Sequence, residues 1–374
     1  MVDLLFSMAD QLRFDAISAV NPLLHTPHLD RLAAEGVRFS KAYSSTPTCT
    51  PARAALLTGR SPWNHGMLGY GVIAVDYPFE FPRALSNGSG YETITIGKDH
   101  FGWNNNKSGH SGGTRFAHSY ASWTVYDGLV SESDTYHEWF SSAPKRGANV
   151  SRPEDCWPTL DMNSWSGAPY ACDEYLHPTA WTGRAAVTFL ETRARAGRNR
   201  PPFLLKVSFH RPHSPYDPPN RLLNATAAAD VPSPVRPATG WSRKYRDCGE
   251  KSSADTWCGE QSASAESLSR RAYHASVAFV DEQIGQIHQT LRRTGLLATT
   301  LWLFTSDHGD AQGDHWHWRK GYPYEFSSHV PMILRWPDRA WPIDVPRPNL
   351  RRGAVLPELI ELRDVAPTLL YAPE

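Results

Sequence analysis

The 374-residue sequence contains no hydrophobic run long enough to cross a membrane, and it carries no net charge. Lysine and arginine together number 38, and aspartate and glutamate also number 38, so the formal charge at pH 7 is zero. A membrane-spanning helix needs about 20 consecutive apolar residues, whereas a nucleic-acid-binding surface usually has an excess of basic residues. The composition therefore gives no reason to expect a membrane span or a nucleic-acid partner.

Cysteine is scarce and its number is odd, since the sequence has five. Cys156 and Cys172, and likewise Cys248 and Cys258, lie close together in polar segments rich in tryptophan and proline. Four cysteines allow three pairings, of which local pairing within these two segments is favoured. That pairing leaves Cys49 without a disulfide partner.

A secretory signal peptide is also lacking, because the opening residues MVDLLFSMAD have the pattern of a buried β-strand. Four N-glycosylation sequons and the paired cysteines nevertheless indicate an oxidising compartment. The sequons begin at Asn87, Asn106, Asn149 and Asn224. We therefore expect a protein of the secretory pathway, lysosomal or extracellular, or a periplasmic protein if the source is bacterial, with its targeting segment outside the given sequence.

Strand-like runs alternate with helical segments along the chain, which is typical of an α/β protein. The expected strands are Val2–Met8, Glu92–Ile96, Phe203–Phe209, Thr300–Thr305 and Val330–Trp336. The expected helices are Thr26–Glu35, the segment after Cys49, Thr182–Ala194 and Ser267–Thr294. Residues 102–180 and 224–265 have little periodicity, and we expect them to be long surface excursions from one domain that spans residues 1–374.

Acidic, basic and imidazole side chains follow four of the expected strands. These residues are, strand by strand, Asp10 and Gln11, Lys98 and His100, His210 and His213, and Asp307 and His308. In open α/β sheets, ligands bind beyond the carboxyl ends of the strands. One such case would mean little, but four of them predict a site at this rim of the sheet.

Four of these residues offer mainly oxygen ligands together with one imidazole. They are Asp10, Gln11, Asp307 and His308. Such a set suits Ca²⁺, or else Mg²⁺ or Mn²⁺, better than zinc, which prefers nitrogen and sulfur ligands. A single aspartate after a strand is more often a cap or turn residue, but two acidic strand ends favour a metal.

Four basic residues, most of them near these strand ends, are suited to holding an anion. Lys98 and His100 are two residues apart, so in extended backbone their side chains point the same way. Flanking prolines stiffen the segment around His213 in RPHSPYDPP. Lys320 follows the aromatic stretch HWHW, which we interpret either as a substrate-binding wall of Trp316 and Trp318 or as a packing loop. Taken alone, Lys98 and His100 are better explained by an exposed turn, and His213 is about as consistent with a plain structural turn.

The segment CTPARAALLTGR, residues 49–60, has the signals of a short helix that begins near Cys49. Pro51 suits the first helical turn and Gly59 suits the end. Arg53 then lies in the first turn, where the helix dipole disfavours a cation. The local pattern alone does not explain why an unpaired thiol and an arginine share this position.

This segment resembles the signature of the sulfatase family, C-x-P-x-R followed by a TGR-like tail. The segments TPHLDRLAAEGVRFSKAY, ADQLRFDA, IGKDHFG, FHRPHSPYDPP and FTSDHGDAQGDH…RKGYPYE also resemble sulfatase motifs, in the family's order. The resemblance covers residues 2 to about 370. It implies an alkaline-phosphatase-like fold, with a central, mostly parallel sheet flanked by helices.

The resemblance also implies a role for Cys49. In sulfatases this cysteine is oxidised to Cα-formylglycine by a formylglycine-generating enzyme that recognises C-x-P-x-R. The aldehyde hydrates to a gem-diol, and one hydroxyl attacks the sulfur of a sulfate ester, which gives a covalent sulfated intermediate and expels the alcohol. The second hydroxyl then collapses the hemiacetal and releases sulfate.

By the same resemblance, the other predicted site residues take roles around this nucleophile. Asp10, Gln11, Asp307 and His308 would bind Ca²⁺, and Asp307 could also accept the attacking proton. Arg53 would contact the diol and the ester, and His100 would assist the collapse. Lys98, His213 and Lys320 would hold sulfate oxygens, with Lys320 or His213 protonating the leaving oxygen.

The sequence departs from the family pattern in two places. Gln11 stands where the common pattern has a second acid, and His308 where it has an amide. The chain also stops after ELRDVAPTLLYAPE, so the small carboxyl-terminal subdomain of the family is expected to be missing. The alternatives to a sulfatase are a phosphate or phosphonate monoester hydrolase of the same superfamily and a non-catalytic glycan-binding homologue.

Overall fold

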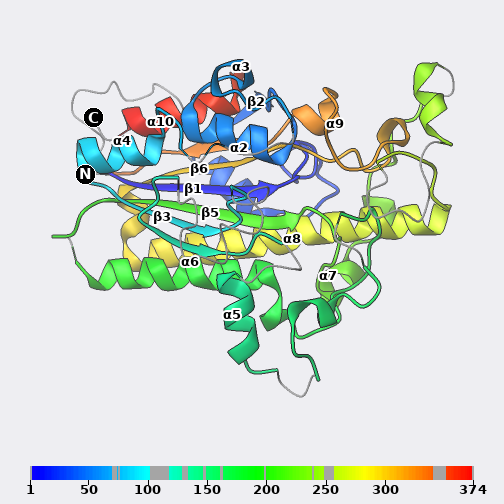
Figure 1. Cartoon of the computed structure of the whole chain (residues 1–374), viewed down its shortest axis with the longest axis horizontal. Helices are drawn as coiled ribbons and strands as arrows, with labels where there is room; N and C mark the ends of the chain where they lie inside the picture. The colour runs from blue at the N-terminus through cyan, green and yellow to red at the C-terminus, as the bar shows by residue number, and fades with distance from the viewer. Residues whose placement is uncertain are drawn as a thin grey trace.

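An eight-stranded sheet forms the centre of the protein in the computed structural model (Figure 1). The structure describes residues 2–69, 74, 76–101, 118–128, 134–145, 149–160, 163–197, 199–237, 240–247, 257–339 and 351–372. The strands are β1 (Asp3–Asp10), β2 (Val37–Tyr43), β3 (Glu92–Gly97), β4 (Ser122–Val125), β5 (Phe203–Pro212), β6 (Thr300–Ser306), β7 (Met332–Arg335) and β8 (Ala354–Glu361). Their order is β4-β3-β5-β1-β6-β7-β2-β8, and all neighbours are parallel except β7, which runs antiparallel to β6 and β2.

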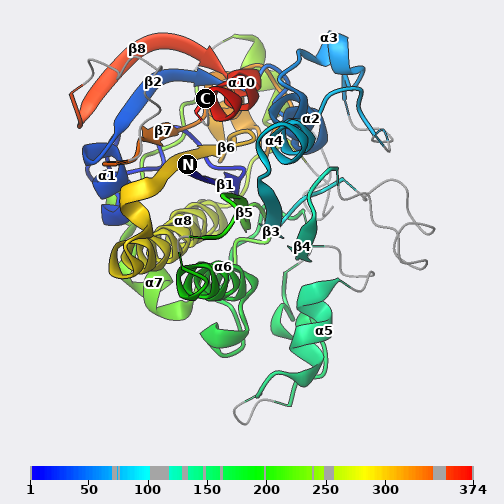
Figure 2. The same ribbon diagram turned by 90° about the vertical axis from the view of Figure 1, so that its left-hand side faces the viewer.

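Helices cover both faces of this sheet, which confirms the predicted α/β class (Figure 2). One face packs against α1 (Pro27–Ala34), α6 (Pro178–Arg195) and α8 (Ala263–Thr294), and the other against α2 (Cys49–Thr58), α4 (Phe81–Ser89) and α10 (Val365–Tyr371). The remaining described helices are α3 (Pro62–His65), α5 (Thr135–Ser142), α7 (Asn220–Ala225) and α9 (Glu325–Ser328). None of the helices in the described part of the chain is long and apolar enough to cross a membrane.

The central strands are buried on both sides, which explains why they read as continuous apolar runs. In β1, Leu5 belongs to the hydrophobic cluster with α1, α6 and α8, whereas its neighbours Leu4 and Phe6 belong to the cluster with α2, α4 and α10. Successive side chains of a strand point to opposite faces. A parallel sheet covered by helices on both faces therefore favours apolar residues on both sides of each central strand.

The sequence predicted five of the eight strands, namely β1, β3, β5, β6 and β7. The missed strands lie at or near the two edges of the sheet. β4 has four residues and lies inside the segment expected to be a surface excursion, and β8 leaves Val355 and Leu359 half or more exposed. Strands that are short or solvated on one side do not form an apolar run.

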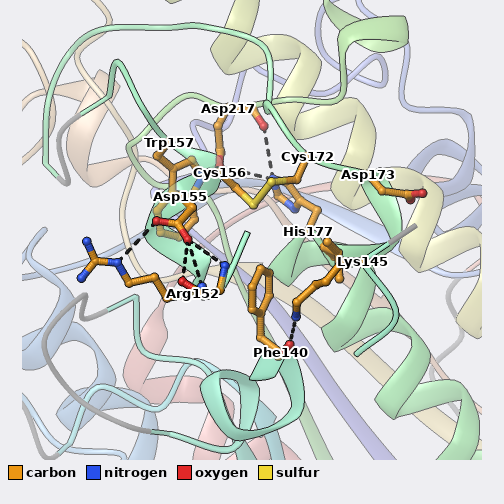
Figure 3. Close-up of a disulfide and its surroundings, with 12 residues drawn as sticks. Phe140, Lys145, Arg152, Asp155, Cys156, Trp157, Cys172, Asp173, His177 and Asp217 are labelled. Carbon is orange, nitrogen blue, oxygen red and sulfur yellow. Dashed lines mark hydrogen bonds and ion pairs between the residues drawn. A yellow bond between two sulfur atoms is a disulfide. The ribbon is translucent and has the colours of Figure 1, made fainter. Parts of the chain in front are cut away.

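The first excursion also contains the predicted disulfide between Cys156 and Cys172 (Figure 3). Their Cα atoms are 5.3 Å apart, and the indole N–H of the adjacent Trp157 donates to Asp217 at 2.6 Å. Cys258 is disulfide-bonded as well, whereas Cys248 lies outside the described residues. Cys49 is free and buried, as predicted.

Three of the four sequon asparagines lie within the described residues, and all three are exposed. They are Asn87, Asn149 and Asn224. Asn106 lies outside the described residues. These three positions are therefore accessible to a modifying enzyme on the folded protein.

The parallel orientation of β1, β3, β5 and β6 brings their carboxyl ends to one rim of the sheet. At the end of β3, Gly97 has φ +92, and a Cβ atom there would overlap the carbonyl oxygen of Ser208 on β5. The same carbonyl accepts the N–H of Lys98 at 2.7 Å. Only glycine fits this close approach without strain, so Gly97 sets the position of Lys98.

We predict that Gly97→Ala lowers the free energy of unfolding by about 3 kcal/mol or more, because the methyl group would collide with the β5 backbone. Gly66→Ala is the matched control, since Gly66 also has positive φ (+81) but no atom lies within 4 Å of the position that a Cβ would occupy there. That variant should lose only the left-handed conformational cost of about 1 kcal/mol. Urea unfolding of both variants measures the difference, and equal losses would contradict the close-approach explanation.

Candidate functional site

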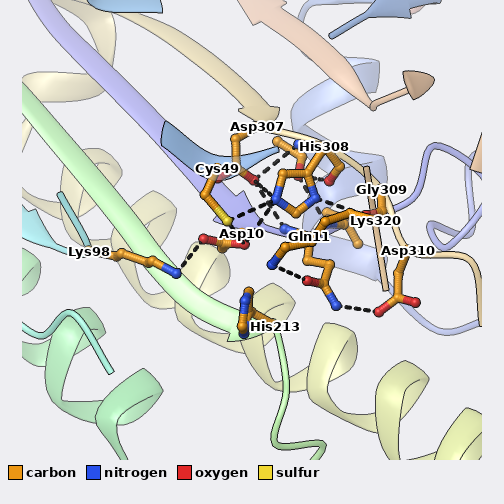
Figure 4. Close-up of polar contacts among 12 residues, drawn as sticks. Asp10, Gln11, Cys49, Lys98, His213, Asp307, His308, Gly309, Asp310 and Lys320 are labelled. Carbon is orange, nitrogen blue, oxygen red and sulfur yellow. Dashed lines mark hydrogen bonds and ion pairs between the residues drawn. The ribbon is translucent and has the colours of Figure 1, made fainter. Parts of the chain in front are cut away.

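Four buried side chains meet at the rim of the sheet (Figure 4). They are Asp10 at the end of β1, Cys49 at the start of α2, and Asp307 and His308 directly after β6. One ligand atom from each lies within 4.8 Å of the others. The structure thus brings together two strand ends and a helix start that are far apart in sequence.

Cys49 is the first residue of α2, and its side chain faces this cluster. Its Sγ lies 3.1 Å from His308 Nε2 and 3.8 Å from Asp10 Oδ1, and the residue is 1% exposed. Burial and the charge of Asp10 oppose ionisation of the thiol, but the nearby charges of Lys320, His308 and Lys98 hold its pKa well below the usual value. Residue 49 therefore lies in an environment that stabilises a negative charge.

Arg53 donates to both carboxylates of the cluster, which explains why a cation lies near the start of α2. Its Nε donates to Asp307 at 2.9 Å and its Nη2 to Asp10 at 3.2 Å. Its Nη1 donates to the carbonyl of Lys98 (2.9 Å) and to Ser208 Oγ (3.1 Å). Charge-assisted bonds of this kind outweigh the unfavourable helix dipole.

The two carboxylates respond differently to this environment. Burial favours the neutral form of Asp10, but Lys98, His213 and Arg53 together hold its pKa well below the usual value. Burial and the charge of Asp10 raise the pKa of Asp307. The ligand oxygens of the two carboxylates lie within 4.8 Å of each other. Two buried carboxylates this close repel each other, so an additional cation would be stabilised between them.

The predicted anion-binding residues surround the cluster. Lys98 Nζ lies 2.7 Å from Asp10 Oδ2. His100 has φ +61, and its N–H donates to Asp127 at 3.1 Å. His213 Nδ1 lies 2.8 Å from the Ser214 carbonyl oxygen, so this contact does not involve the second ring nitrogen, Nε2. Burial lowers the pKa of both histidines, and the charge of Lys98 adds to the effect.

The side chains of Gln11 and Lys320 contact each other, and neither is hydrogen-bonded to the side chains of Asp10 or Asp307. Lys320 Nζ donates to Gln11 Oε1 at 2.7 Å, and Gln11 Nε2 donates to Asp310 Oδ2 at 2.5 Å. Asp310 also accepts the Tyr216 hydroxyl at 2.7 Å. Asp310, Tyr216 and Ser208 were not predicted from the sequence, although the repeated acid in SDHGD is a signal for Asp310.

The two tryptophans of HWHW do not form an exposed wall. Trp316 is 8% exposed and Trp318 is 1% exposed. The indole N–H of Trp318 donates to the Gly259 carbonyl at 3.1 Å, and its ring packs edge-on against Trp165. Of the two interpretations of this stretch, the packing loop is the one that the structure supports.

Comparison with known proteins shows one family over nearly the whole chain. The Sulfatase family model matches residues 3–372. An arylsulfatase of Clostridium perfringens is 36% identical over 97% of this chain and 73% of its own length, and the human iduronate 2-sulfatase is 26% identical over 98% of this chain and 68% of its own.

Solved structures show the same architecture. A phosphonate monoester hydrolase of Agrobacterium radiobacter superposes with a TM-score of 0.75 at 26% identity, covering 100% of this chain and 74% of that one. A phosphonate monoester hydrolase from Silicibacter pomeroyi superposes with a TM-score of 0.78 at 23% identity, covering 100% and 73%, and this second likeness concerns the fold alone.

We predict that Arg53→Lys lowers the free energy of unfolding by about 3 kcal/mol, because a lysine cannot bond both buried carboxylates and leaves one unpaired. Arg221→Lys makes the same change in an exposed pair with Glu174 and Glu282 and should change stability by about 0.5 kcal/mol at most. Urea denaturation measures both. A loss at Arg53 no larger than that at Arg221 would rule out the proposed bridging of the carboxylates.

Proposed function

The chain belongs to the sulfatase family, and from that premise we propose that it hydrolyses a sulfate monoester with a nucleophile derived from Cys49. The observation that carries the proposal is the position of this residue. Cys49 is a free cysteine at a helix start, in contact with His308 and close to Asp10. Conversion to formylglycine would give a hydrated aldehyde at this position. One of its hydroxyl oxygens would attack sulfur and form a covalent sulfated enzyme, and the second hydroxyl would then release sulfate, so that water need not attack sulfur.

The burial of Cys49 bears on when such a conversion takes place. The residue is 1% exposed, so a formylglycine-generating enzyme has no access to it in the folded protein. We propose that the partner acts on C-x-P-x-R before the domain folds. The Cys156–Cys172 disulfide supports maturation in an oxidising compartment, which is secretory or, for a bacterial source, periplasmic.

The carboxylate pair fits a divalent cation. Asp10, Asp307 and His308 would hold Ca²⁺, with Mg²⁺ or Mn²⁺ as alternatives, and residue 49 would add an oxygen after conversion. His308 Nδ1 bonds to the Gly309 carbonyl at 2.9 Å, which orients Nε2 toward the cluster. When bound, the cation would favour deprotonation of a hydroxyl on residue 49. Gln11 could join the ligands only if its oxygen left Lys320.

The surrounding basic residues would bind the sulfate group and complete the reaction. We propose that Lys98, His213 and Lys320 hold sulfate oxygens, that Asp307 accepts the attacking proton, and that His100 assists release of sulfate. Lys320 Nζ lies in donating contact with Gln11, whereas burial and the charges of Lys320 and Lys98 lower the pKa of His213 well below its usual value and so disfavour its protonated form. Lys320 is therefore the better candidate to protonate the leaving oxygen.

A phosphonate or phosphate monoester hydrolase is the second candidate, because the Agrobacterium neighbour has that activity in its name and the same fold. The same anion-binding residues and the same nucleophile at residue 49 would serve either reaction. A non-catalytic glycan-binding homologue is disfavoured by the intact set of buried charged residues.

We predict that the peptide containing Cys49 from active protein lacks sulfur at residue 49, and that the protein turns over 4-nitrophenyl sulfate at least tenfold faster than phenyl phosphonate or phosphate esters. Intact-mass and peptide mass spectrometry measure the first, and parallel kcat/KM values measure the second. Cys49→Ala is the inactive control. An unmodified thiol would favour the binding homologue, and the reverse preference among the esters would favour the second candidate.

We predict that Ca²⁺ stabilises the protein after treatment with a chelator. A ligand at a hundredfold excess over its dissociation constant adds about 2.7 kcal/mol to the stability of the folded state. The midpoint of thermal unfolding should rise with added Ca²⁺, and Asp307→Asn should abolish the rise. An equal rise in the variant would place the cation elsewhere.

A further inference from the structure

We propose that Asp310 is a positioning residue, which orients the amide of Gln11 and thereby the ammonium group of Lys320. The inference rests on the proposed function, because that proposal gives Lys320 its role in binding the ester. The contacts that link the three residues are independent of that role. They form a chain from Asp310 through Gln11 to Lys320 (Figure 4).

Asp310 is a fully buried carboxylate whose two oxygens each accept two hydrogen bonds. Oδ2 accepts Gln11 Nε2 at 2.5 Å and the Tyr216 hydroxyl at 2.7 Å. Oδ1 accepts the backbone N–H groups of Gln312 at 3.0 Å and Arg319 at 3.1 Å. All four partners are donors, so the carboxylate acts only as an acceptor.

The polarity of the Gln11 amide follows from its two neighbours. A carboxylate can only accept, so the amide nitrogen must face Asp310. An ammonium group can only donate, so the amide oxygen must face Lys320. The reversed amide would place donors against Lys320 and an acceptor against Asp310. Because Asp310 accepts from the amide nitrogen of Gln11, the amide oxygen faces Lys320 and accepts its N–H.

The backbone around Gln11 is also constrained. Gln11 has φ +69, its N–H donates to Asp307 Oδ1 at 3.1 Å, and its carbonyl accepts the Tyr273 hydroxyl at 2.8 Å. The main chain is thus held on both sides, so the Gln11 side chain reaches Asp310 and Lys320 from a fixed backbone position. The position of the ammonium group is thus set by the protein before any ester binds.

Asp310 contacts the lysine segment a second time, through the backbone. Asp310 accepts the N–H of Arg319, the residue that precedes Lys320. Arg319 has φ +68. The ammonium group keeps two of its three hydrogens for other partners, with Cys49 and Asp10 among the nearby charges. We infer that Asp310 directs these hydrogens toward the site of the reaction.

The test is a double-mutant cycle of Asp310→Asn and Gln11→Glu, measured in the full chain by thermal unfolding and by kcat/KM for 4-nitrophenyl sulfate. In Asp310→Asn the new amide opposes the Gln11 nitrogen, so Gln11 should turn its own nitrogen toward Lys320. In Gln11→Glu the new carboxylate opposes Asp310. In the double variant the new amide at position 310 donates to the new carboxylate at position 11, which also accepts from Lys320. The exchange restores the chain of contacts with the net charge unchanged.

We expect each single variant to lose about 100-fold in kcat/KM, as for the loss of a transition-state contact, and the double variant to exceed the product of the two single effects by at least tenfold. The double variant should also unfold at a higher temperature than either single one. Asp314→Asn is the matched control, since this buried aspartate of the same loop pairs with Arg13. It should lower the unfolding temperature while kcat/KM stays within threefold.

Two results would overturn the inference. If the unfolding temperatures show no coupling, the amide polarity is not set by Asp310. If they show coupling but kcat/KM does not, Asp310 only stabilises the loop. Should the wild-type protein hydrolyse no sulfate ester, the proposed function fails, whereas the unfolding cycle still reports on the chain of contacts.

Discussion

Two buried carboxylates held side by side by one guanidinium group are the constraint on which the rest of the site depends. Asp10 and Asp307 end neighbouring strands of a parallel sheet, so the fold itself brings their charges together. Such a pair is stable only with cations close by. Arg53 supplies the first of these, and Lys98 and His308 lie within ion-pair distance of the pair.

This concentration of charge also accounts for the placement of α2. The helix starts with Cys49 against the carboxylates and, one turn later, places Arg53 between them. A nucleophile at residue 49 would therefore lie beside the carboxylate pair and the basic residues that the same packing brings together. The basic residues are buried, so their charges are poorly screened by solvent and would act strongly on a bound anion.

The strand ends of the site could be predicted from the sequence because they depend on local features. A buried strand followed by Asp10, Lys98, His213 or Asp307 is visible as an apolar run with a polar end. The partners of these residues could not be predicted in the same way. Asp310 and Tyr216 are 94 residues apart, and their contact arises only when β5 and β6 lie on either side of β1.

Arg53 illustrates the same limit. The sequence indicated that its charge must have a reason to lie at a helix start, and the expected partner was a bound ester. The observed partners are Asp10 and Asp307, which only the assembled sheet brings within reach. The edge strands β4 and β8 were missed for a related reason, since pairing with a neighbour and not an apolar pattern defines them.

The reversed direction of β7 determines where sequence can be added to this fold. Met332 at the start of β7 lies opposite Thr305 near the end of β6. The connection from residue 307 to 331 therefore leaves the sheet and returns to it at the same end of the strands. A parallel neighbour would instead require a crossover to the far end. Insertions or deletions in this connection can therefore change the loop that carries Lys320 while the strand register on either side stays intact.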